Sequence, residues 1–84
     1  MYAYSSPVAQ IEHTAHEAFD IAWNFLSASE ELDDVTIAQA FVAVEIMRLL
    51  QRGERHRIRL ANLAIAAFQK TLPTEREASL AGYI

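Results

Sequence analysis

Two histidines and three acidic residues between positions 12 and 20 are the first group in this sequence that could do chemistry. On a helix, Glu12, His16 and Asp20 share one side at four-residue spacing, and His13 and Glu17 lie beside them. Imidazole and carboxylate groups together suit zinc, iron or manganese. No second cluster completes a coordination shell, so we predict ordinary surface pairs, no metal and no cofactor. If a metal did bind, the candidate ligands would be His13, His16, Glu17 and Asp20.

A basic cluster is the second candidate, because five of the seven Lys and Arg residues lie within positions 48–59. Guanidinium groups match the geometry of phosphate and carboxylate. Several of them would stand at a helix N-terminus, where cations are unfavourable and a negative partner is wanted. Anion or nucleic-acid binding is therefore the alternative function, with the candidate residues Arg52, Arg55, Arg57 and Arg59. The simpler interpretation is a solvated turn with ion pairs between subunits.

The net charge of the chain and the residues around the cluster argue against a nucleic-acid partner. The formal net charge of −4 repels phosphate. Base-stacking aromatic residues, a Gly-rich phosphate loop and a helix-turn-helix pattern are all missing there. Arg57 falls on an apolar arc of its predicted helix, where we expect it to be half buried against Glu45.

Catalysis has no support in the sequence. The 84 residues include no cysteine, and the serines lie in predicted caps and turns without a His–acid partner. No G-x-S-x-G motif is present. We therefore predict a protein that is not an enzyme and has no catalytic residues. The same lack of cysteine excludes a disulfide scaffold, and a hydrophobic content of 52% excludes intrinsic disorder.

Targeting signals are not visible in the sequence. The first residues lack the basic and apolar segments of a secretory signal. The purest apolar runs, 40–44 and 63–68, are far shorter than the roughly 18 residues of a membrane span. We expect no membrane association, and a cytoplasmic location by default.

Helical periodicity runs through most of the chain and predicts a single all-α domain over residues 1–84. The expected architecture is a three-helix, up-down-up arrangement. The predicted helices span about 7–28, 35–52 and 55–72, and residues 73–84 form a C-terminal tail.

Local signals support these boundaries. Ser6 is a suitable N-cap for the first helix, and Asp33 or Asp34 for the second. Gly53 is placed to end the second helix in a left-handed conformation. A single glycine does not always end a helix, so one continuous rod of about 37 residues, or about 55 Å, stays open as an alternative.

The second and third helices are more apolar than one chain is expected to cover. Each half of 35–52 is apolar well beyond the roughly 100° stripe of a surface helix, and the third helix is apolar over about 220°. Extra apolar surface usually marks an interface, and a two-fold dimer is the commonest solution. We predict a homodimeric helical bundle with these interface residues: Phe41, Val42, Val44, Ile46, Met47, Leu50, Ile65 and Phe68.

Charge is also divided between the two ends of the second helix. Four acids lie within positions 30–34, and the basic cluster begins near the other end. The helix separates them by about 27 Å at 1.5 Å per residue, beyond the Debye length of about 8 Å. An antiparallel dimer would bring them together, and we expect such a dimer to weaken as salt rises. The leading interpretation is a small interaction or regulatory module that associates with itself or with an unidentified protein partner.

Overall fold

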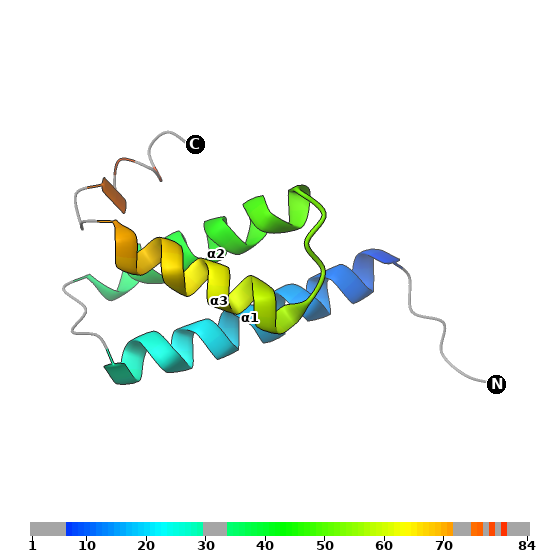
Figure 1. Ribbon diagram of the computed structural model, residues 1–84, viewed down its shortest axis with the longest axis horizontal. Helices are drawn as coiled ribbons and strands as arrows, with labels where there is room; N and C mark the ends of the chain where they lie inside the picture. The colour runs from blue at the N-terminus through cyan, green and yellow to red at the C-terminus, as the bar shows by residue number, and fades with distance from the viewer. Residues whose placement is uncertain (1–6, 30–33, 72–74, 77, 79, 81–84) are drawn as a thin grey trace.

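Three helices pack together in the computed structural model, which describes residues 7–29, 34–71, 75, 76, 78 and 80 (Figure 1). Helix α1 spans Pro7–Ser29, α2 spans Val35–Gln51 and α3 spans Arg57–Lys70. Each helix contacts both of the others. The described part of the chain contains no strand, so the predicted all-α class is confirmed.

The core is apolar and draws on all three helices. Phe41 of α2 meets Phe68 of α3 edge to face, with ring centroids 6.0 Å apart. No polar or charged side chain is buried among the residues that the structure describes. Hydrophobic burial therefore holds the helices together. The buried residues are Ala18, Ala22, Leu26, Ala38, Phe41, Val42, Ile46, Leu50, Leu60, Ala61, Ala64 and Phe68.

Asp34 begins α2. Its Oδ1 accepts the N–H of Ile37 at 3.1 Å, which confirms Asp34 as the N-cap. The other cap candidates, Asp33 and Ser6, lie outside the described residues. A short acidic side chain at this position satisfies a free N–H, and the positive end of the helix dipole stabilises its negative charge.

Gly53 ends α2 and separates it from α3. Its φ is +102°, and its N–H donates to the Leu50 carbonyl while the N–H of Glu54 donates to the Leu49 carbonyl. This pair of bonds is the Schellman motif. Arg55 Nη1 donates to the same Leu50 carbonyl at 2.6 Å. The continuous rod left open by the sequence is thereby excluded.

Arg76 covers the C-terminal end of α3. Its Nη2 donates to the Phe68 carbonyl at 2.6 Å, and its Cζ lies 3.5 Å from the centroid of the Phe68 ring. One cation therefore donates to a carbonyl in the last turn of α3, which also accepts from Thr71, and covers the face of a core aromatic ring. Residues 75, 76, 78 and 80 are helical, in the region expected to be a tail or one helical turn.

We predict that replacing Gly53 destabilises the fold through backbone conformation alone. A Cβ at this position would meet nothing within 4 Å, so Gly53→Ala adds no clash. The left-handed conformation should cost alanine about 1–2 kcal/mol in the free energy of unfolding. Gly53→Asn is the matched control and should lose less, because asparagine tolerates this region. Urea unfolding followed by circular dichroism measures both, and equal losses would contradict the explanation.

Candidate functional site

The basic cluster is held by acceptors of the chain itself. Arg59 Nε lies 2.8 Å from Glu54 Oε1, and Arg57 Nη1 lies 3.1 Å from Glu17 Oε2 on α1. Arg55 Nη1 donates to the backbone carbonyls of Leu50 and Glu54. Three of the four candidate anion-binding arginines thus have acceptors within the chain, and the fourth, Arg52, is the exposed C-cap of α2.

The expected contact between Arg57 and Glu45 is wrong. Arg57 stands in the first turn of α3, where it reaches Glu17 on α1, and its side chain is 54% exposed. Glu45 instead faces Arg48 on its own helix, at 3.5 Å. A helical wheel gives the direction of a side chain on its own helix but not the neighbour that it meets.

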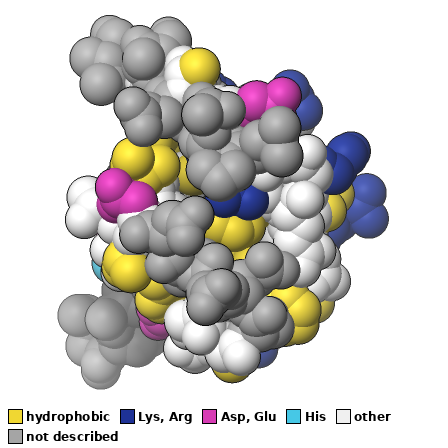
Figure 2. Space-filling model, turned by 90° about the vertical axis from the view of Figure 1, so that its left-hand side faces the viewer, with side chains coloured by type: hydrophobic (Ala, Val, Ile, Leu, Met, Phe, Trp, Pro, Cys, Tyr) yellow, Lys and Arg dark blue, Asp and Glu magenta, His cyan; other side chains and the backbone are white. Residues whose placement is uncertain are grey.

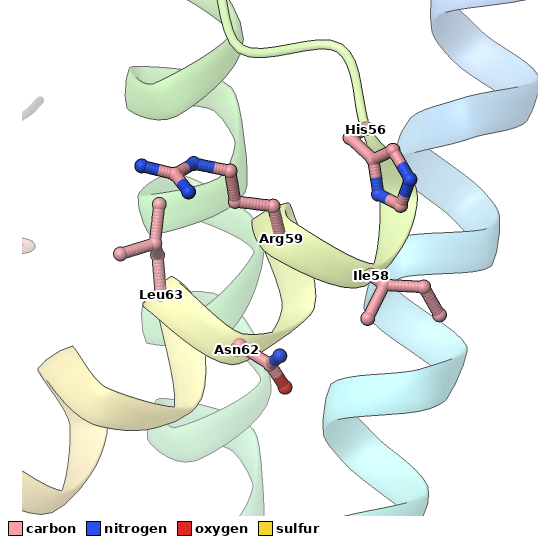
Figure 3. A pocket seen from close by; sticks show the side chains of 5 residues that line it. All are labelled: His56, Ile58, Arg59, Asn62 and Leu63. Atoms are coloured by element: carbon pink, nitrogen blue, oxygen red, sulfur yellow. The ribbon is translucent and has the colours of Figure 1, made fainter.

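A shallow pocket of about 470 Å³ lies beside this cluster (Figure 3). Its lining comes from α3 and its N-cap alone: His56, Ile58, Arg59, Asn62 and Leu63. Figure 3 shows these side chains spreading away from one helix rather than converging on a common point. Arg59 is paired through its Nε with the carboxylate of Glu54.

His13 and His16 both lie on α1 and line one pocket between α1 and α2, together with Glu12. His13 Nε2 lies 3.4 Å from Glu17 Oε2, the same oxygen that binds Arg57. His16 also lines an adjoining, more apolar hollow between the two helices. Across 7–29, 34–71 and the four described positions beyond, no three His, Asp or Glu residues are arranged to hold a metal ion. Glu17 acts as a shared acceptor between α1 and α3.

A groove between α1 and α2 is the most apolar concave feature described. Its narrower part, about 260 Å³, is lined by Ala15, His16, Phe19, Ala43, Ile46 and Met47. A wider part of about 690 Å³ continues toward the N-terminal end of α1 and includes Leu50 and Gln51. This groove was not predicted from the sequence. The sequence contains only the apolar stripes of the two helices, and these stripes form a groove only when the helices pack against each other.

Five of the eight expected interface residues belong to the core of a single chain. Phe41, Val42, Ile46, Leu50 and Phe68 are buried among residues of their own chain. This corrects the premise that one chain cannot cover them: α2 packs against both α1 and α3, and two neighbours suffice for this side of the helix. These five side chains are therefore not available at the surface.

The other three expected interface residues keep some exposure. Met47 is 46% exposed, and Val44 and Ile65 are partly buried. Ile65 packs against the core, whereas Val44 and Met47 lie with Ala40 on the side of α2 opposite its buried residues. We call Ala40, Val44 and Met47, with Ile37 before them, the outer face of α2. Figure 2 shows that hydrophobic side chains reach the surface on one end of the bundle, with Lys and Arg gathered to one side.

Comparison of the chain with known protein families, curated proteins and solved structures finds no match.

Among the helices that the structure describes, none has the length and hydrophobicity needed to cross a membrane.

We predict that the Arg57–Glu17 pair contributes modestly to stability. Both side chains are partly exposed, so a double-mutant cycle of Arg57→Ala and Glu17→Ala should give a coupling of about 0.2–1 kcal/mol. Urea unfolding of the four proteins measures this coupling. The control cycle pairs Arg52→Ala with Glu17→Ala and should give none. Equal coupling in the two cycles would contradict the contact.

Proposed function

We propose that this chain is a small, non-catalytic α-helical interaction module that associates with itself, with the outer face of α2 as its main contact. The observation that carries the proposal is the exposure of Met47, a large apolar side chain that is 46% exposed on an apolar face. Exposed apolar residues that are contiguous mark interaction sites more often than scattered ones do. Methionine in particular adapts to the shape of a partner.

The groove between α1 and α2 extends this apolar surface. Met47 and Ala43 belong to both the groove and the exposed side of α2, so a partner on α2 would also contact Phe19 at the groove's edge. The proposal takes the chain to be an up-down-up domain that forms a homodimeric bundle. Helix α3 buries Leu60 and Phe68 in the core and leaves Ile58 and Leu63 exposed, so in this proposal it contributes less than α2. The cytoplasmic location stays a prediction.

The alternative, anion binding by the basic cluster, has less support. Arg55, Arg57 and Arg59 donate to Leu50, Glu17 and Glu54 of the same chain. An anion bound to Arg57 and Arg59 would lie beside the carboxylates of Glu17 and Glu54. Like charges at such short range oppose binding.

We predict that the full chain is a dimer that persists to low micromolar concentration, and that the dimer weakens as salt rises. Light scattering after size exclusion, over a dilution series at low and high salt, measures its mass. Met47→Asp should shift the chain toward monomer, because it places a charge on the apolar face. Ile58→Asp is the matched control, since Ile58 is 44% exposed on α3. A monomer at every concentration would overturn the proposal.

A further inference from the structure

We propose that two copies of this chain pair through α2 in antiparallel orientation, about a two-fold axis near Val44. The inference rests on the proposed self-association and names its geometry and its occupant. Three independent features of α2 support it: the spacing of its exposed apolar residues, their sizes and the charges at its ends.

The spacing of the outer face is that of a helix-pairing surface. Ile37, Ala40, Val44 and Met47 follow one another at intervals of three, four and three residues. This is the a and d spacing of helices that pack along their length. All four retain exposure, while the opposite side of α2 is buried against α1 and α3. The face is flanked by the exposed polar residues Thr36 and Gln51, as the rim of an interface commonly is.

The sizes of these residues favour the antiparallel orientation. At 1.5 Å per residue, Met47 lies about 4.5 Å from Val44 toward the C-terminal end, and Ala40 about 6 Å toward the other. A two-fold axis near Val44 therefore places Met47 of each copy opposite Ala40 of the other. A large side chain then fills the space left by a small one, twice by symmetry. A parallel pair would set alanine against alanine and leave a gap.

The charges at the ends of α2 favour the same orientation. Asp34 caps its N-terminal end and Arg52 its C-terminal end, and both are exposed. They are about 27 Å apart in one chain, at 1.5 Å per residue, so they do not pair within it. About the proposed axis, Arg52 comes within about 3 Å, measured along the helix, of the level of Asp34 in the second copy. A parallel pair would bring like charges together.

This self-complementarity is what identifies the occupant as a second copy. A face built for an unrelated protein has no need to match its own inverted image in size and in charge. An isologous interface requires that match, because the same patch of both copies forms it. Where a residue of one copy contacts a second residue of the other, the reverse contact is made as well.

Single-cysteine cross-linking tests the geometry in the full chain, which contains no cysteine of its own. Val44→Cys should form a disulfide-linked dimer under mild oxidation, since residues at the axis bring their Cα atoms within about 7 Å. Ala40→Cys mixed with Met47→Cys should form a mixed dimer faster than either variant links to itself. Ile58→Cys, on the exposed side of α3, should stay monomeric on denaturing gels.

A second measurement guards against a loss of folding. Val44→Asp places two like charges at the axis and should raise the dissociation constant at least tenfold, while circular dichroism shows the helical content retained. If the chain is a dimer but Val44→Cys does not cross-link, the antiparallel pairing fails and the proposed self-association stands. The antiparallel orientation would also be overturned if Ala40→Cys alone cross-linked as fast as the mixture of Ala40→Cys and Met47→Cys. A chain that is monomeric under all conditions would contradict both the antiparallel pairing and the proposed self-association.

Discussion

Helix α2 packs between two neighbours, which bury two of its sides, and it is also apolar on a third side. The need to cover this third side is the constraint that governs the rest of the molecule. The contact of Phe41 with Phe68 closes the core from one side of α2. Contacts with α1 close it from another. What remains is the outer face, where Val44 and Met47 reach the surface. The neighbours that α2 has in the described region, α1 and α3, leave Met47 46% exposed on this face. The association that we propose follows from this shortage of neighbours rather than from a special binding motif.

The charged residues act mainly at the ends of the helices. Asp34 satisfies a free N–H at the start of α2, and Arg55 donates to the Leu50 carbonyl at its end, which also accepts the N–H of Gly53. Arg76 does the same for α3, and Glu17 connects α3 to α1 through Arg57. Free helix-end groups must find such partners when water is partly excluded. Three arginines of the basic cluster, Arg55, Arg57 and Arg59, thus contact acceptors of the chain itself at the α2–α3 turn and between α1 and α3.

Local signals in the sequence predicted the local structure well. Asp34 and Gly53 define the two ends of α2 because each acts on its own few residues, through a cap and a left-handed turn. The tertiary contacts were not predictable in this way. Glu17 and Arg57 are 40 residues apart, and nothing in either segment specifies the other. For the same reason, the apolar arc of α2 could not be divided in advance into a core side, with Phe41, and an outer side, with Met47. That division depends on where α1 and α3 pack.

Nuclear magnetic resonance spectra of the backbone amides over a series of protein concentrations test the central claim most directly. The claim is that the outer face of α2 is where the chain meets another copy. On dilution, we expect amide shift changes that concentrate in residues 37–47, while those on the exposed side of α3, around Ile58 and Leu63, stay constant. Changes confined to α3 would contradict the account, and so would spectra that are independent of concentration in a chain whose mass shows it to be a monomer.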